Sequence, residues 1–259
     1  MLKQKSIIKR STISAVVLIL LVSATPAQKK PGSPTDAVIN FYRDLKAKRY
    51  VEGFRHSVYR GAVEGLTPAE LQDLEPDFSR TFAAIPDKIE PSNEQISGDT
   101  ATVSLKFGDA GEAQQVALVR VGSEWLVGDK ETLALVNSQS RAFFFNARML
   151  VNEGEAYEML QRIMGAEIIY SRKFEGKNAS LEELIRLGGV PKDIEDGEAS
   201  GYQFALTLSA DQKSFFATAL PSSYGKTGKI SFYCDINGVH GEDLKGQPAT
   251  ERSPIYQPK

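Results

Sequence analysis

The sequence feature that most constrains the fold is a long helical pattern from Asn152 to about Phe174. Its apolar residues recur mostly at intervals of three and four, at Ala156, Met159, Leu160, Ile163, Met164, Ile168 and Tyr170. These intervals place side chains on one face of an α-helix, so the pattern predicts an amphipathic helix with one apolar stripe. Such a stripe is more typical of a hydrophobic core than of a cofactor site.

A short helix and several strands are predicted after the long helix. Ser180 and Glu183 stand at the two positions of a capping box, and Gly188-Gly189 favours a helix end because glycine accepts a left-handed backbone. Alternating apolar and polar residues follow at 202–208, 214–220 and 230–236, and an Asn-Gly turn signal follows at 237–238. Residues 141–242 are therefore predicted to form an α+β module.

The single cysteine, Cys234, lies in the last of these strand segments. Side chains alternate between the two faces of a strand, so Cys234 shares a face with Ile230, Phe232 and Ile236. This pattern predicts a buried structural thiol. One cysteine also excludes an intramolecular disulfide and a cysteine-rich zinc site.

Residues 35–136 are predicted to form a separate α+β module. Ser33 or Thr35 is placed to cap a first helix, and Thr67, Pro68 and Glu70 form the start signal of a later one. Strand patterns follow at 95–97, 101–107, 114–121 and 124–127, with glycine-containing turns between them. Helices followed by an antiparallel meander are typical of the α+β class.

The first module resembles the secreted branch of the NTF2-like superfamily, the DUF4878-type and lumazine-binding-like domains. The resemblance rests on PTDAVINFYRDLKAKRYVEGF, a further helix, and strands that end in VALVRVGSEWLVGD. It implies a curved antiparallel sheet that helices wrap into a cone with an apolar pocket. The candidate pocket-lining residues are Phe41, Tyr42, Phe54, Phe78, Phe82 and Trp125. The same aromatic residues are also what a small domain needs to fill its core.

Some NTF2-like proteins are isomerases or dehydratases that place an Asp, Tyr or His in the cone. The ionisable candidates here are His56, Asp77 and Asp87, with Tyr42, Tyr50 and Tyr59 as hydroxyl donors. Catalysis requires such a group within hydrogen-bond reach of a substrate proton, which spacing along the chain does not establish. His56 stands between Arg55 and Ser57, a polar context that favours a surface position.

The second module resembles the globular head of a type IV pilin or pseudopilin. The matching segments are NEGEAYEMLQRIMGAEIIYSRKFEGKNASLEELIRLG, GYQFALTLSADQKSFFATALP and GKISFYCDINGVH. The resemblance implies a long helix packed on a small antiparallel sheet. Pilins assemble through an N-terminal hydrophobic helix that follows a prepilin cleavage site, and neither feature precedes Asn152. Assembly into a pilus is therefore not expected.

The N-terminal residues 1–27 have the organisation of a secretory signal peptide. Four basic residues within the first ten precede an apolar run at 13–22, and small residues follow. Cleavage is expected after Ala24 or Ala27, and a retained signal that anchors the protein in the membrane is the alternative. Residues 28–34 form a predicted linker, and the polar composition of residues 243–259 predicts a flexible tail.

Several functional classes lack any support in the sequence. The formal net charge of −2 offers no basic footprint for nucleic acid. No phosphate-binding loop, serine-nucleophile elbow or zinc-protease motif occurs, and no cofactor is predicted. Asp235 and Asn237 are weak calcium candidates, because an Asp-x-Asn-Gly sequence is also what a tight turn needs. His240 has no second ligand at metal-binding spacing.

These observations predict an exported, non-enzymatic binding or scaffold protein of the bacterial cell envelope. Its partner is expected to be an envelope protein or a small apolar ligand, with membrane contact only through a retained signal. One alternative is small-molecule binding, with or without isomerase-like chemistry, in the cone of the first module. A second alternative is an accessory role in a type IV pilus or type II secretion system.

Overall fold

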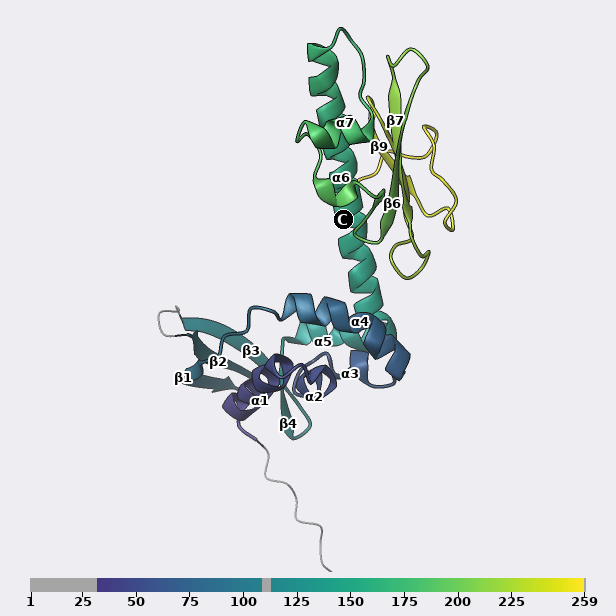
Figure 1. The fold of residues 1–259 in the computed structure, drawn as a ribbon. Helices are drawn as coiled ribbons and strands as arrows, with labels where there is room; N and C mark the ends of the chain where they lie inside the picture. Colours follow the sequence, from purple (N-terminus) through teal and green to yellow (C-terminus); the bar gives the residue numbers. More distant parts are fainter. Residues whose placement is uncertain (1–31, 109–112, 259) are drawn as a thin grey trace, which may run out of the picture. The chain divides into compact units, whose positions relative to one another are not determined.

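The computed structural model describes residues 32–108 and 113–258, and these fold as an α+β protein with two antiparallel sheets (Figure 1). The predicted signal peptide and the first part of the predicted linker lie outside the described residues. Within the described ranges, none of the helices combines the length and the apolar character needed to cross a bilayer.

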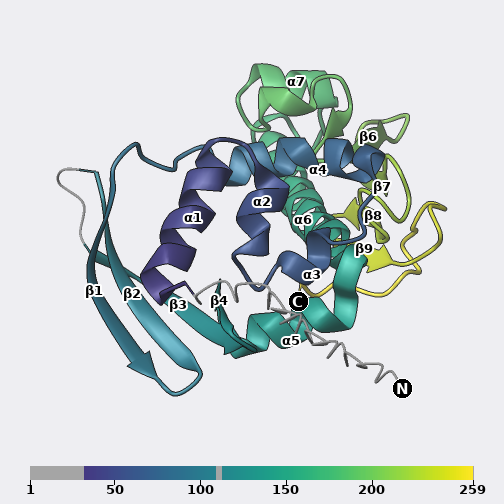
Figure 2. The same ribbon diagram turned by 90° about the horizontal axis from the view of Figure 1, so that it is seen from below.

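Four helices precede the first sheet: α1 (Pro34–Lys46), α2 (Tyr50–Arg55), α3 (Arg60–Val63) and α4 (Pro68–Thr81). Four strands follow as an antiparallel meander: β1 (Ile89–Ser97), β2 (Thr100–Phe107), β3 (Ala113–Val121) and β4 (Glu124–Val127). Helix α1 packs against β1, β2 and β4 (Figure 2). The core between helices and sheet contains Phe41, Leu45 and Phe54 from the helices and Val103, Leu105 and Leu118 from the strands.

Of the two candidate caps at the start of α1, Ser33 caps the helix and Thr35 does not. The Ser33 hydroxyl accepts a hydrogen bond from the Asp36 backbone N–H at 3.1 Å, and Asp36 bonds back to the Ser33 N–H. The Thr35 hydroxyl instead donates to Glu94 of β1 at 2.6 Å. Ser33 is therefore the cap, and Thr35 ties the helix to the sheet.

The capping box predicted at the start of α4 is confirmed. The Thr67 hydroxyl accepts a hydrogen bond from the Glu70 backbone N–H at 3.3 Å. The Glu70 carboxylate in turn accepts from the Thr67 backbone N–H at 2.8 Å. Pro68 occupies the first turn, where its missing N–H costs no hydrogen bond.

Helix α6 (Phe143–Lys173) is longer than the predicted helix, because it begins nine residues before Asn152. It follows α5 (Lys130–Gln139) and the 3₁₀ turn η1 (Ser140–Ala142). The ring of Phe144, in the first turn of α6, lies 5.0 Å from that of Phe54 and 4.9 Å from that of Phe78, centroid to centroid. The run of three phenylalanines at 143–145 thus starts the helix and contributes to the first core.

Helix α7 (Leu181–Arg186) and the 3₁₀ turn η2 (Lys192–Ile194) precede the second sheet. Its strands lie in the order β5 (Glu198–Ala199), β6 (Tyr202–Leu208), β7 (Phe215–Pro221), β8 (Ser231–Asp235) and β9 (Gly238–Glu242). Leu160 and Ile163 of α6 pack with Tyr202, Phe232 and Cys234 of this sheet. The burial predicted for Cys234 is confirmed, and it raises the pKa of the thiol to about 12.

The end of the chain packs against β9, although its composition predicts a flexible tail. The Gly241 N–H donates to the Pro254 carbonyl at 3.0 Å, and the Tyr256 N–H donates to the Val239 carbonyl at 2.9 Å. The ring of Tyr256 meets that of Phe232 edge-on at 4.9 Å. One partly buried aromatic ring, together with backbone pairing to an edge strand, holds a segment whose other residues are mostly polar.

The dependence of the second core on α6 gives a stability prediction. Leu160→Ala should lower the free energy of unfolding by about 2–5 kcal/mol, because it leaves a cavity in a packed core. Leu150→Ala is the matched control on the same helix: Leu150 is 55% exposed and Leu160 is 0% exposed. The control should change stability by less than about 0.5 kcal/mol. Urea unfolding measures both, and equal losses would contradict this assignment of the core.

Candidate functional site

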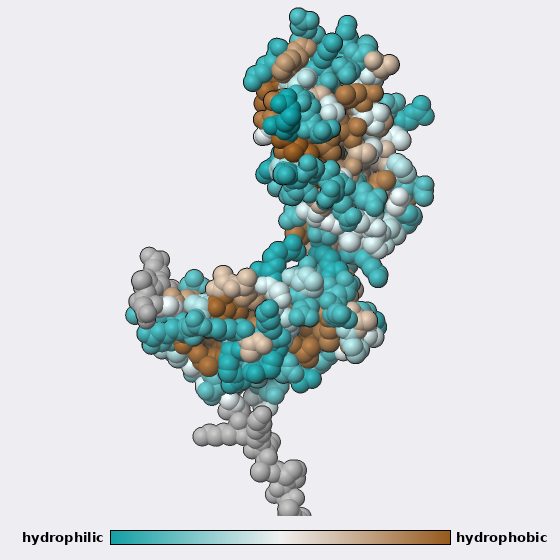
Figure 3. Space-filling model, viewed as in Figure 1, coloured by the Kyte–Doolittle hydropathy of each residue, from teal (hydrophilic) through white to brown (hydrophobic). Residues whose placement is uncertain are grey.

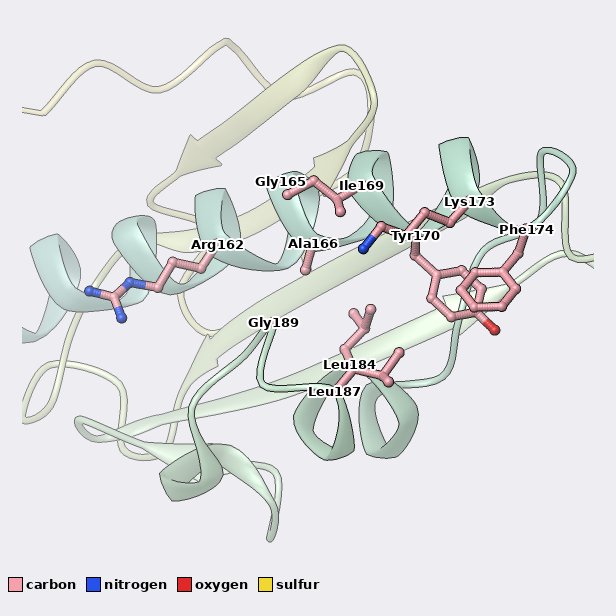
Figure 4. Close-up of a pocket in the computed structure, with 10 residues that line it drawn as sticks. All are labelled: Arg162, Gly165, Ala166, Ile169, Tyr170, Lys173, Phe174, Leu184, Leu187 and Gly189. Carbon is pink, nitrogen blue, oxygen red and sulfur yellow. The ribbon is translucent and has the colours of Figure 1, made fainter.

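An apolar groove lies between α6 and α7 in the second module (Figure 4). It has a volume of about 450 Å³. One face of α6 contributes Arg162, Gly165, Ala166, Ile169, Tyr170, Lys173 and Phe174, and the segment of α7 contributes Leu184, Leu187 and Gly189. Intervals of three and four along α6 show that a single helical face forms one wall over three turns.

Two glycines shape the wall that α7 contributes. Gly188 ends the helix with a left-handed φ of 72°, as predicted from the sequence. A Cβ atom on Gly189 would lie 3.1 Å from the Cβ of Ala166, so glycine allows the chain to pass close to α6 at this point. Figure 4 shows Leu184 pointing toward α6, with Ala166 pointing back at it. Small residues on both sides thus form the floor of the groove.

The N-terminus of α7 is only in part the predicted capping box. The Ser180 hydroxyl accepts from the Glu183 backbone N–H at 3.3 Å, as a helix cap does. The Glu183 carboxylate, however, binds the Arg186 guanidinium with contacts of 2.8 and 2.6 Å. An i,i+3 ion pair on the helix surface thus takes the place of the reciprocal hydrogen bond.

Three large apolar side chains of the groove are exposed. Ile169 is 56% exposed, Leu187 50% and Phe174 45%, whereas Leu184 beneath them is buried. The rings of Tyr170 and Phe174 stack at 4.2 Å and close one end of the groove. In Figure 3, hydrophobic surface interrupts the hydrophilic surface over the part of the chain that contains α7. Contiguous exposed apolar surface of this kind is typical of binding sites.

The charged residues that line the groove are both basic. Arg162 lies at one end and Lys173 near the other, with the Lys173 side chain turned back along α6 (Figure 4). Within residues 32–108 and 113–258, neither side chain takes part in an ion pair or hydrogen bond. The groove therefore combines an apolar floor with two cations that are available to a ligand.

Glu167 lies on a different face of α6 and is fully buried. One carboxylate oxygen, Oε2, accepts hydrogen bonds from the Asn178 amide at 3.0 Å and from the Ala179 N–H at 2.9 Å. In the described part of the chain the other oxygen, Oε1, has no hydrogen-bond partner. Burial raises the pKa of Glu167, and the two hydrogen bonds oppose that rise only in part. This carboxylate fastens the segment before α7 to α6.

The six aromatic residues predicted to line a pocket do not gather around one cavity. Phe41, Phe54 and Phe78 are buried in the first core, and the rings of Phe54 and Phe78 meet edge-on at 5.0 Å. Tyr42 and Phe82 line a hollow of about 500 Å³ at the edge of the module, together with Ile85 and Phe107. Trp125 is half-buried, and the Arg120 guanidinium lies 5.5 Å from the centre of its ring.

The ionisable candidates of the first module lie in ion pairs or next to charged residues. Asp77 binds Arg80 at 3.0 Å and Arg148 at 2.6 Å. Asp87 binds Lys46, which lowers the pKa of this carboxyl. His56 lies 3.6 Å from the Asp44 carboxylate. Asp77, Asp87 and His56 are not among the described residues that line the hollow beside Tyr42 and Phe82.

The three tyrosines considered as hydroxyl donors make three different sets of contacts. Tyr42 lines the hollow, and burial raises the pKa of its hydroxyl. The Tyr50 hydroxyl lies 2.8 Å from that of Ser79, with which it shares a hydrogen bond. Tyr59 packs its ring against Phe54, Phe143 and Phe144. These contacts are those of side chains that hold helices together.

The weak calcium candidates Asp235 and Asn237 lie in the turn between β8 and β9. The Asp235 carboxylate accepts a hydrogen bond from the Asn237 backbone N–H at 2.7 Å and a longer one from its side-chain amide. His240 is buried, and its Nδ1–H donates to the Ser253 carbonyl at 2.6 Å. Nowhere in the described ranges do three or more His, Cys, Asp or Glu side chains cluster as a metal site requires.

Part of the chain is similar to a solved structure. No family model and no curated protein matches the chain. Among solved structures, an NTF2-like transpeptidase from Campylobacter jejuni matches 37% of this chain and 97% of its own, with 18% identity. The TM-score of this match is 0.24.

The groove was not predicted from the sequence. Tyr170 packs against the core that contains Leu160 and Ile163, as its place in the predicted stripe implies, and it also lines the groove, because α6 carries two apolar faces. One face packs on the sheet, and the other lies between Arg162 and Phe174. The intervals along this second face were visible in the sequence, but the position of α7 that leaves it open was not.

Buried Glu167 gives a prediction with a definite sign. Because its pKa is raised in the folded protein, the stability associated with the protonated group is present below the unfolded pKa of about 4.5 and is lost as pH rises through the folded value. Glutamine does not ionise, so Glu167→Gln should gain stability relative to the wild type as pH rises from 4 to 8. Urea unfolding at several pH values measures this difference. Glu158→Gln removes an exposed carboxylate from the same helix and should show little trend; an equal trend would contradict the prediction.

Proposed function

We propose that this protein is an exported, non-enzymatic binding or scaffold component of the bacterial cell envelope, and that the groove between α6 and α7 is its binding surface. The observation that carries the proposal is an open apolar groove with two cations that form no ion pair or hydrogen bond with the described residues. Exposed Ile169, Phe174 and Leu187 lose their contact with water when a partner covers them, and burial of apolar surface drives most protein association.

The residues of the first module support a structural role for that module. Its aromatic side chains pack against one another, and the candidate carboxylates Asp77 and Asp87 are held in ion pairs. A general base needs a free lone pair within reach of a substrate proton. Both carboxylate oxygens of Asp77 bind arginines, and one oxygen of Asp87 binds Lys46. The proposal therefore assigns binding to the second module and a supporting role to the first.

A second candidate function is small-molecule binding by the first module, favoured by the hollow that Tyr42, Phe82 and Phe107 line. Its volume of about 500 Å³ is within the usual range for ligand pockets, which runs from about 300 to 1,000 Å³. Soaking crystals with a mixture of small apolar compounds would test it. Density in the hollow would support this function, and its absence while other sites fill would count against it.

The second module has the order of elements that its resemblance to a pilin head implies: a long helix, a short helix and an antiparallel sheet. This order supports the inference that the module is pilin-head-like. An accessory role in a pilus or type II secretion system would follow if the partner of the groove proves to be a pilin-like protein.

The groove is tested by site-specific photo-crosslinking in cells that make the protein. A photoreactive benzoylphenylalanine at Ile169 or at Leu187 should give the same covalent adduct, identified by mass spectrometry. The control position is Val151, which is comparably exposed on the same helix but does not line the groove. No adduct from either groove position, or the same adduct from Val151, would contradict the proposal.

Export is tested by fractionation of bacterial cells and intact-mass measurement. The mature protein should appear outside the cytoplasm with a mass that lacks residues 1–24 or 1–27, because cleavage is expected after Ala24 or Ala27. Substitution of both alanines by bulky residues should block processing if the small side chains are the cleavage signal. A full-length protein that stays in the cytoplasm would contradict export.

A further inference from the structure

The groove between α6 and α7 has features that specify the kind of partner it accepts. We propose that its occupant is an amphipathic α-helix of a partner protein, with an acidic residue at each end of an apolar stripe. This inference rests on the proposed function, because it requires the groove to be the binding surface. It goes further by assigning the conformation and the charge pattern of the occupant.

The charge pattern follows from the two cations of the groove. Arg162 and Lys173 stand at opposite ends of the face of α6 that lines it, and their backbone positions, eleven residues apart, are separated by roughly 16 Å at 1.5 Å per residue. The other eight lining residues are uncharged. An occupant therefore gains most from two negative charges, one for each of these cations. A fatty acid has only one carboxylate, so it would leave one of the cations unmatched.

The conformation follows from the hydrogen-bonding groups that the groove lacks. Two helices form its walls, and their backbone N–H and C=O groups are largely paired within each helix. An extended peptide laid against apolar side chains would have unpaired backbone groups next to a surface that offers few partners, which is costly. A helix pairs its own backbone and presents only side chains. The helix-in-groove mode of recognition suits these walls.

The floor of the groove defines the apolar stripe of the partner. Gly165, Ala166 and Gly189 leave room above the floor, and Ile169 and Leu187 stand at its sides. Large side chains at one-turn intervals on the partner would fill this room. The matching sequence has acidic residues eleven positions apart, with Leu, Ile or Phe at the fourth and seventh or eighth positions between them.

The N-terminal apolar run of this chain does not meet this description. Residues 13–22 follow Lys3, Lys5, Lys9 and Arg10, so their flank is basic, as the ends of the groove are. Like charges at the end of the groove would oppose binding. A separate acidic partner therefore suits the groove better than this segment does.

The test uses two fluorescein-labelled helical peptides of about 20 residues with the same apolar stripe, long enough to populate a helix in water. One has Glu at both flanking positions and the other has Lys. Fluorescence anisotropy with the full-length protein should show the Glu peptide binding roughly three- to thirtyfold more tightly at low salt, the range expected for two exposed ion pairs. The difference should shrink in 1 M salt because the charges are screened.

Protein variants assign the effect to the groove. Arg162→Glu with Lys173→Glu should reverse the preference, so that the Lys peptide binds more tightly. Ile169→Asp should abolish binding of both peptides, whereas Val151→Asp, at a comparably exposed position of the same helix, should not. Circular dichroism establishes that each variant is folded. Both cations are exposed and form no ion pair within residues 32–108 and 113–258, so their reversal should not disturb the fold.

The outcomes separate this inference from the proposed function. Equal affinity for the two peptides, or a preference that the charge reversal leaves unchanged, would overturn the acidic-helix inference. So would the failure of both peptides to bind, or displacement of the peptides by micromolar palmitate, even if photo-adducts still form at Ile169. Loss of those adducts as well would remove the groove as a binding surface and the proposed function with it.

Discussion

Helix α6 is the element on which the rest of the structure depends, because it contributes to both hydrophobic cores. At 31 residues it is about 46 Å long at 1.5 Å per residue. Phe144 in its first turn packs with Phe54 and Phe78 of the first module, and Leu160 and Ile163 pack on the second sheet. A short isolated helix is marginally stable in water, so most of the stability of α6 comes from these apolar contacts. Either core would lose a wall without it.

The same helix explains why the second module has a binding surface. The second sheet covers only one face of α6, and α7 covers only part of the remaining surface of this helix. Gly189 allows the chain after α7 to pass close to Ala166, which shields the middle of this face. Ile169 and Phe174 remain exposed beyond it. The groove is thus a consequence of a long helix with two apolar faces and a second helix of only six residues.

Much of the local structure could be predicted from the residues, because local rules govern it. The Thr67 capping box, the left-handed Gly188 and the burial of Cys234 each depend on contacts within a few positions or on the alternation of a strand. The α+β class followed from the same patterns. Strand β9 was missed because only its turn carries a strong signal, and its pairing with β8 is a tertiary contact. The packing of Tyr256 against Phe232 was missed for the same reason.

By itself, the sequence determined the class of the fold, the positions of most helices and strands, and the absence of any recognisable catalytic motif. Only the tertiary structure decided which apolar residues are core and which are surface. Leu160 and Ile169 are both apolar residues of α6, yet one is buried on the sheet and the other is exposed beside α7. The physical reason is that hydrophobic burial has no direction of its own. Which face of a helix it covers depends on where distant segments of the chain come to lie.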